Sequence, residues 1–211
     1  MAESYVIGVD FGSDSVRALI VNTETGENVG QGVACYPRWK AGLYQHPEYS
    51  IFRQHPLDYL ESLEKCITTA LAELTEEQKD HVIGIGVDTT GSTPVPVDKN
   101  GTPLALLDEF AENENAMFFL WKDHAAAAEA DEINKLFRNN SENDYTKYQG
   151  DYSAEWYWAK ILYAVRHDEA IRQAAYTWEE HCDWMTGILC GETRPEKIYH
   201  SACAAGHKAL W

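Results

Sequence analysis

One short stretch near the N-terminus, "DFGSDSVR", combines the side chains that phosphate and a metal ion require. Its first aspartate offers the oxygen ligands that magnesium prefers, and its glycine permits a tight turn whose N–H groups can face an anion. The serines add hydroxyl donors, and the arginine adds a planar guanidinium that matches phosphate oxygens. Phosphoryl transfer uses these same parts, so we predict a phosphate site with magnesium held by the aspartate. An ordinary polar turn with an exposed arginine is the alternative. The predicted residues are Asp10, Gly12, Ser13, Ser15 and Arg17.

An antiparallel meander of three strands is predicted to position this stretch, because apolar runs alternate with short turns. Residues 37–56 are aromatic and broken by prolines, so we expect a loop there. Pro56 then opens a helix in which leucines recur at helical spacing up to residue 74. The run at 82–88, "VIGIGVD", is continuously apolar, which indicates a strand buried on both faces. The three strands of the meander are expected at residues 5–10, 16–22 and 28–36.

The second half of the chain is predicted to be mainly helical after a hairpin at 92–107. Asn100-Gly101 supplies the turn of this hairpin, and its prolines favour edge strands. Ser153 is placed to cap one helix, and Gly191 is placed to end another in a left-handed C-cap. The tail from 192 onward is expected to be irregular. The helices are expected at residues 115–137, 153–168, 168–178 and 179–191.

Composition limits the possible partners. The chain has 211 residues and a formal net charge of −17, so binding to nucleic acid or to an anionic membrane surface is not expected. Five cysteines at irregular spacings do not indicate a disulfide framework. No apolar run is long enough to span a bilayer, and the N-terminus lacks signal-peptide features. We therefore expect a cytoplasmic protein.

Three segments together resemble the FGGY family of carbohydrate kinases, within the larger actin, sugar kinase and Hsp70 fold. "IGVDFGSDSVRALIVN" resembles the first phosphate-binding hairpin of that family, and "GIGVDTTGSTPVPVDKNGTPL" resembles its second signature stretch. "RQHPLDYLESL" is similar to the helix start that lies between them. "DTTGSTPVPVD", "FFLWKDHAAAAEA" and "SACAAGHKALW" point to ribulokinase-type members. The resemblance implies an α/β fold of the actin-like, ribonuclease H-like type, with a helical insertion after residue 112.

The same resemblance implies ATP-dependent transfer of a phosphoryl group to the terminal hydroxyl of a ketopentose such as L-ribulose, with ATP and Mg²⁺ as cofactors. Asp10 would orient the magnesium, and the other residues of the hairpin would face the phosphates. A sugar pocket needs polar groups for hydroxyls and an aromatic face for C–H surface, and adjacent Trp121 and Lys122 offer both. The alternative is that Trp121 packs in the core and that Lys208 is merely exposed. The implied sugar-binding residues are Gly91, Ser92, Trp121, Lys122 and Lys208.

The family's general base, an aspartate, and its adenosine-binding elements lie C-terminal to the "GHK" stretch, beyond Trp211. Asp88 matches the sugar loop, so we do not assign it as the base. The catalytic residue therefore remains unknown, and we expect residues 1–211 to be a truncated N-terminal domain that is inactive alone. A kinase for another ketose or polyol, such as xylulose or ribitol, and a non-catalytic actin-like sugar-binding module remain alternatives.

Histidines and cysteines gather toward the C-terminus, and an aromatic run at 153–167 precedes them. Structural zinc sites usually show tighter paired spacing, so isolated buried cysteines are the favoured interpretation and zinc the alternative. The aromatic run sits near helical spacing, which indicates a packed face. Apolar surface left uncovered on this chain would favour a homodimer or self-association. The candidate metal ligands are His181, Cys182, Cys190, His200, Cys203 and His207.

Overall fold

The structure is a computed structural model that describes residues 3–140, 142 and 144–210. The chain divides into two compact units, each made of two segments. Unit 1 comprises Met1–Leu43 and His55–Thr90, and unit 2 comprises Tyr44–Gln54 and Gly91–Trp211. The predicted phosphate-binding residues therefore fall in unit 1, and the predicted sugar-binding residues fall in unit 2.

Unit 1 contains a four-stranded sheet in the order β3-β2-β1-β6. Its first three strands form the predicted antiparallel meander, and β6 pairs in parallel with β1. Residues 12–14 join β1 to β2, and the register of this hairpin places Asp10 opposite Arg17. The strands are β1 (Tyr5–Phe11), β2 (Ser15–Asn22), β3 (Asn28–Cys35) and β6 (Val82–Thr89), and a short helix, α3 (Glu76–Asp80), precedes β6.

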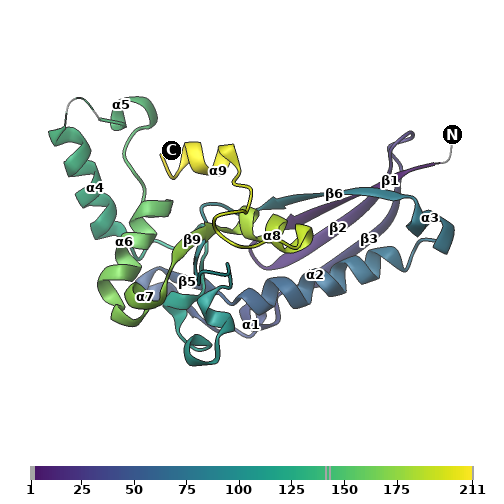
Figure 1. Cartoon of the computed structure of the whole chain (residues 1–211), viewed down its shortest axis with the longest axis horizontal. Helices are drawn as coiled ribbons and strands as arrows, with labels where there is room; N and C mark the ends of the chain where they lie inside the picture. The colour runs from purple at the N-terminus through teal and green to yellow at the C-terminus, as the bar shows by residue number, and fades with distance from the viewer. Residues whose placement is uncertain (1–2, 141, 143, 211) are drawn as a thin grey trace. The chain divides into compact units, whose positions relative to one another are not determined.

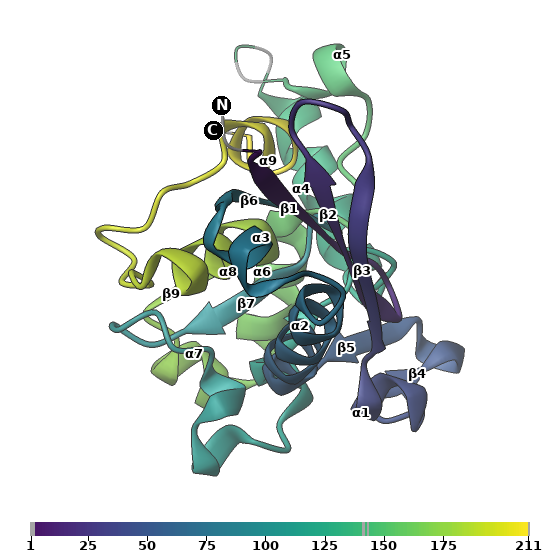
Figure 2. The same cartoon turned by 90° about the vertical axis from the view of Figure 1, so that its right-hand side faces the viewer.

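Helix α2 (Pro56–Leu71) covers one face of this sheet and runs along β2 and β3 (Figures 1 and 2). The helix begins at the predicted proline, and the His55 imidazole caps it by accepting a hydrogen bond from the Leu57 backbone at 3.2 Å. Helix and strand approach so closely that a Cβ on Gly32 would lie 2.1 Å from the Cys66 carbonyl oxygen. The buried residues that alternate along β1 and β2 are Ile7, Val9, Phe11, Val16, Ala18 and Ile20.

The opposite face of the sheet is open in the described part of unit 1. Leu19 and Val33 on this face are 47% and 60% exposed. The prediction that β6 is buried on both faces is wrong, because Ile83 and Ile85 are also exposed. Ile85 pairs with Ile7 and shares its face, but α2 lies over β2 and β3 and does not cover β6. The apolar run therefore predicted the strand correctly, but it predicted the burial of that strand incorrectly.

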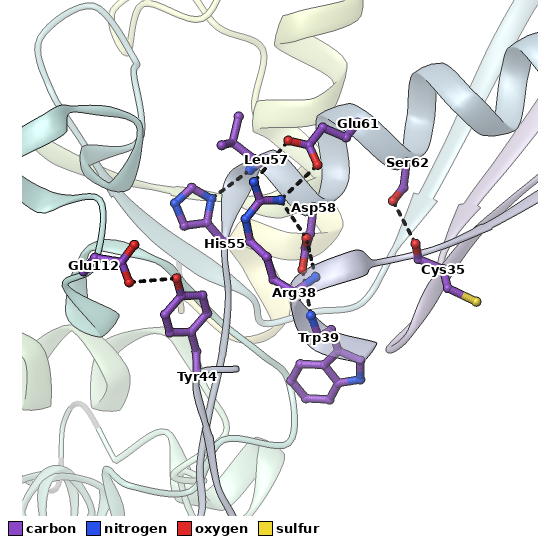
Figure 3. A network of polar contacts seen from close by, with 10 residues as sticks. All are labelled: Cys35, Arg38, Trp39, Tyr44, His55, Leu57, Asp58, Glu61, Ser62 and Glu112. Carbon is purple, nitrogen blue, oxygen red and sulfur yellow. Dashed lines mark hydrogen bonds and ion pairs between the residues drawn. The ribbon is translucent and has the colours of Figure 1, made fainter. Parts of the chain in front are cut away.

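A polar network joins α1 (Pro37–Lys40) to the first turn of α2 (Figure 3). Asp58 is buried and accepts hydrogen bonds from the backbone N–H groups of Arg38 and Trp39, both at 3.1 Å. The Arg38 guanidinium lies 3.0 Å from Asp58 and donates to both carboxylate oxygens of Glu61. These hydrogen bonds lower the pKa of Glu61. Residues 37–56 are therefore more ordered than the predicted loop.

Unit 2 combines two small sheets with several helices. One sheet has the order β4-β5-β8, and the other pairs β7 with β9 in antiparallel fashion. Its strands are β4 (Gln45–His46), β5 (Ile51–Gln54), β7 (Pro94–Val97), β8 (Phe118–Phe119) and β9 (Thr177–Glu180). Its α-helices are α4 (Ala127–Asn139), α5 (Thr146–Gln149), α6 (Tyr157–His167), α7 (Glu169–Ala174), α8 (His181–Cys190) and α9 (Ala202–His207). The 3₁₀ turns are η1 (Pro47–Tyr49), η2 (Leu104–Leu106), η3 (Asp108–Phe110) and η4 (Glu114–Ala116).

Several helix boundaries differ from the prediction. The helix expected at 115–137 begins only at Ala127, because the fully buried Phe118 and Phe119 form strand β8 against β5. Ser153 does not cap α6, because it lies four residues before the helix begins at Tyr157. Its hydroxyl instead accepts a hydrogen bond from the Glu155 backbone N–H. Tertiary strand pairing overrides local helix preference in the first case.

The segment expected to be helical at 168–178 ends its helix at Ala174 and then enters β9. This strand pairs with β7. The segment that was expected to pair with β7 in a hairpin makes only a single bridge, between Val97 and Pro103, and then forms the 3₁₀ turn η2. The turn at Gly101 (φ +78°) and the left-handed C-cap at Gly191 (φ +72°) are confirmed. Within the described residues, no helix is both long and apolar enough to cross a membrane.

Candidate functional site

Asp10 and Arg17 form an ion pair at the turn end of the β1–β2 hairpin. Oδ2 of Asp10 lies 3.0 Å from Nη1 of Arg17, and the side chains are 49% and 54% exposed. A ligand in solvent can therefore reach both groups. A carboxylate of the kind that binds magnesium and a guanidinium of the kind that binds phosphate stand side by side.

The turn between these strands is closed by a backbone hydrogen bond from Gly12 N–H to the Ser15 carbonyl at 2.9 Å. A Cβ on Gly12 would lie 3.3 Å from that carbonyl and 3.8 Å from Nη1 of Arg17, so the glycine keeps space beside the guanidinium. Ser15 is buried, and its hydroxyl donates to Asp14 at 2.8 Å. Ser13 is half-buried in the same turn. Asp10, Gly12 and Arg17 thus fit a phosphate and metal site better than Ser15 does.

Asp88 extends the row of charged residues. The register pairs Asp10 with Asp88 across β1 and β6, and paired residues on neighbouring strands point to the same face. Arg17, Asp10 and Asp88 therefore follow one another across three strands. They line one end of a hollow of about 1040 Å³ on the open sheet face. The sequence analysis placed Asp88 with the sugar loop, and the structure places it beside Asp10.

Gly91, Ser92 and Lys208 come together in unit 2. The Lys208 ammonium donates a hydrogen bond to the Gly91 carbonyl oxygen. The Tyr152 hydroxyl donates to the Lys208 carbonyl at 2.6 Å, which fixes the lysine's backbone. Ser92 is buried, and Lys208 is half-buried. The alternative of a freely exposed Lys208 is therefore wrong.

Two charged residues that the sequence analysis missed hold the loop that contains Gly91 and Ser92. Lys160 on α6 is fully buried and donates to the carbonyl oxygens of Ser92 at 2.7 Å and Leu120 at 2.9 Å. Glu180 on β9 accepts from the Thr93 backbone at 2.8 Å. Burial lowers the pKa of Lys160 and raises that of Glu180. The position of Lys160 inside the apolar run "WAKILYAV" was the feature of the sequence that could have indicated its burial.

Trp121 and Lys122 lie on a loop after β8, and the helix predicted to carry them is not formed there. A buried ion pair between Arg53 and Asp123 anchors this loop to β5. Trp121 is 40% exposed, so it is not packed in the core as the alternative proposed. The Lys122 ammonium lies 4.3 Å from the centre of the Phe52 ring. The loop thus presents an aromatic surface beside a positive charge.

The histidines and cysteines near the C-terminus do not gather into one cluster in the described residues. His181 is fully buried, and burial lowers its pKa to about 3. Cys190 and Cys203 are exposed, and Cys182 is half-buried. The side chain of His207 lies outside the described part. His200 instead faces two acidic side chains, Glu179 and Asp183.

Comparison with solved structures shows the fold. The structure is similar to xylulose kinase from Bifidobacterium adolescentis, with a TM-score of 0.74 and 17% identity over 99% of this chain and 40% of that chain. It is also similar to Plasmodium falciparum glycerol kinase with ADP, with a TM-score of 0.73 and 16% identity over 99% of this chain and 38% of that chain. The predicted actin-like α/β class is confirmed.

Sequence comparison identifies the family. The chain is 53% identical over 210 residues to a ribulokinase of Vibrio parahaemolyticus, and 35% identical over 214 residues to one of Shouchella clausii. These alignments cover 99% and 98% of this chain but only 37% of each relative. Residues 5–203 match the family described as "FGGY family of carbohydrate kinases, N-terminal domain". The chain therefore belongs to the FGGY family of carbohydrate kinases, as a match to the N-terminal domain of that family.

Proposed function

We propose that this chain is the sugar-binding and phosphate-hairpin part of an ATP-dependent ribulokinase that converts L-ribulose to L-ribulose 5-phosphate in L-arabinose catabolism. The observation that carries the proposal is the contact of Lys208 with Gly91, which joins two segments singled out as sugar-binding. Similarity to ribulokinases over nearly the whole chain supports the choice of L-ribulose. A cytoplasmic location belongs to the same proposal.

The proposed roles follow from the chemistry of each group. ATP supplies the transferred phosphoryl group, and Mg²⁺ neutralises its charge. Asp10, with Asp88 beside it, would hold the ion, and Arg17 would bind phosphate oxygens next to the space kept by Gly12. Ser13 would add a hydroxyl donor, whereas Ser15 would first have to release Asp14. The general base remains unassigned.

In the sugar site, Trp121 would cover the C–H face of the sugar, and Lys122 and Lys208 would pair with its hydroxyls. Gly91 and Ser92 would shape the wall of the pocket. A site that pairs each hydroxyl discriminates strongly between sugars, because a missing hydroxyl leaves a buried group without its partner. The xylulose and ribitol alternatives therefore predict a different order of sugar affinities.

Calorimetric titration of the 211-residue chain with L-ribulose, D-xylulose and ribitol tests this assignment. We expect L-ribulose to bind most tightly and Trp121→Ala to weaken it by about tenfold. Tyr148→Ala is the matched control, since Tyr148 is an aromatic residue that is 89% exposed. Tighter binding of xylulose or ribitol would favour the other kinases. A parallel titration with Mg-ATP, compared with Asp10→Asn, tests the hairpin separately, and nucleotide binding that Asp10→Asn leaves unchanged would argue against the proposed role of Asp10.

A further inference from the structure

Glu179, Asp183 and His200 converge in unit 2 from three different elements. Glu179 lies in strand β9, Asp183 lies in the first turn of α8, and His200 precedes α9. One ligand atom from each residue lies within 4.8 Å of the others. They border a pocket of about 360 Å³ whose other walls include Tyr157 and Trp178. The sequence analysis grouped His200 with other histidines and with cysteines, and it did not foresee the two acids.

Glu179 supplies an independent sign that a cation belongs here. Its side chain is 2% exposed, and its Oε2 makes no hydrogen bond to any described residue. Nδ1 of His200 lies 3.5 Å from this oxygen, beyond the usual hydrogen-bond range. A buried carboxylate oxygen without a donor is costly unless a charge compensates it.

The two distances from the His200 nitrogen to the carboxylate oxygens match those between neighbouring ligands of a tetrahedral ion. Nδ1 of His200 lies 3.5 Å from Oε2 of Glu179 and 3.2 Å from Oδ2 of Asp183. Zinc bonds to nitrogen and carboxylate oxygen are about 2.0–2.1 Å long, so neighbouring tetrahedral ligands lie about 3.3–3.4 Å apart. Oδ1 of Asp183 accepts a hydrogen bond from the Ser201 backbone N–H at 2.7 Å. This bond orients the carboxylate, as an additional hydrogen bond commonly orients a side chain that binds a metal.

We propose that Glu179 Oε2, Asp183 Oδ2 and His200 Nδ1 bind a zinc ion, with a fourth position open to water or ligand. Two carboxylates and one imidazole suit zinc or a similar transition metal better than magnesium, which takes oxygen ligands. The His200 side chain is 50% exposed, so the ion has a path from solvent. Bound zinc would tether the segment before α9 to β9 and α8. The proposal does not rest on the kinase assignment.

Cobalt(II) titration of the full chain, followed by visible absorption, tests the site and distinguishes its ligands from cysteine. We expect one cobalt ion per chain with a spectrum of nitrogen and oxygen ligands and without the strong near-ultraviolet band of cobalt–thiolate bonds, and we expect zinc to displace it. His200→Ala and Glu179→Gln should each weaken binding by about tenfold or more. His124→Ala, which removes a different histidine–carboxylate pair, should leave binding unchanged.

His200→Arg separates a metal site from an ordinary ion pair, because it keeps the positive charge and removes the ligand nitrogen. We expect this variant to fold, as checked by circular dichroism, to lose cobalt binding and to lose the rise in melting temperature that zinc gives the parent chain. If the chain binds no cobalt, if the spectrum is that of thiolate, or if His200→Arg and Glu179→Gln bind as tightly as the parent chain, the proposal is wrong.

Discussion

The Lys160 ammonium donates to the Ser92 carbonyl at 2.7 Å and to the Leu120 carbonyl at 2.9 Å. One fully buried lysine therefore connects the loop that holds Gly91 and Ser92 with the loop that leads into Trp121. Its helix lies far from both loops in the sequence. The two predicted sugar-binding segments are thus positioned by a residue outside either of them.

Lys160→Met is expected to destabilise the chain by about 2–4 kcal/mol, because it leaves two buried carbonyl oxygens without a donor. It is also expected to weaken L-ribulose binding. Urea unfolding measures the first effect, and calorimetry measures the second. Lys197→Met, at an exposed position, is the control and should change stability by less than about 0.5 kcal/mol. Equal stability of the two variants would mean that Lys160 does not support the loops.

Gly32→Ala is expected to destabilise unit 1 by about 2–3 kcal/mol or to prevent folding, because its Cβ would lie 2.1 Å from the Cys66 carbonyl oxygen. Gly86→Ala in the same sheet is the matched control, since nothing lies within 4 Å of the added carbon. Thermal unfolding of both variants makes the comparison. A Gly32→Ala protein as stable as Gly86→Ala would show that α2 does not approach β3 this closely.

Leu19→Lys is expected to reduce self-association with a change in stability within about 0.5 kcal/mol. Leu19 is 47% exposed on the open sheet face, and contiguous exposed apolar side chains favour association. Light scattering over a range of concentrations measures the effect. Leu136→Lys changes an equally apolar, 62% exposed residue on α4 and should not reduce association to the same degree. A parent chain that is monomeric at high concentration would contradict this expectation.

Asp168→Ala is expected to cost about 1 kcal/mol at pH 7, because Asp168 caps α7 by accepting from the Ile171 backbone at 3.1 Å. Burial alone raises the pKa of Asp168, but hydrogen bonds from Asn113, Asn115 and the helix start outweigh it and lower the pKa below 3.8. A carboxyl group whose pKa is lower in the folded state than in the unfolded state stabilises the fold at pH values above its unfolded-state pKa. This stabilisation is lost as the pH falls through its folded-state pKa.

The stability difference between Asp168→Ala and the parent chain should therefore shrink below about pH 3.8. Chemical unfolding at a series of pH values measures the difference. Asp131→Ala, at an exposed position of α4, should show no such narrowing. A difference that stays constant down to low pH would argue against the hydrogen-bonded carboxylate.

The sequence predicted unit 1 better than unit 2 for a physical reason. The meander depends on neighbouring strands and short turns, and α2 begins at Pro56 and carries a regular apolar face, so local patterns suffice. Strand β8 exists because Phe118 and Phe119 pair with β5, and β9 exists because it pairs with β7. Such pairings join segments distant in sequence, and helix-favouring residues nearby concealed them.

The candidate site was predicted where residue type alone carries the chemistry, as at Asp10 and Arg17. Lys160 and Glu180 were missed because their importance depends on burial, and burial depends on elements that meet only in the fold. Asp88 was recognised as the end of a strand, but its position beside Asp10 follows from the parallel register of β6. No local pattern encodes that register.

The row of Arg17, Asp10 and Asp88 has a thermodynamic consequence. Two carboxylates and one guanidinium give the row a formal net charge of one negative, which repels a nucleotide. A divalent cation bound between the carboxylates reverses that sign. Each ligand then raises the affinity of the other by the same factor, as reciprocity between coupled binding events requires. If the hairpin binds both ligands as proposed, we therefore expect it to bind nucleotide with the cation more tightly than nucleotide alone.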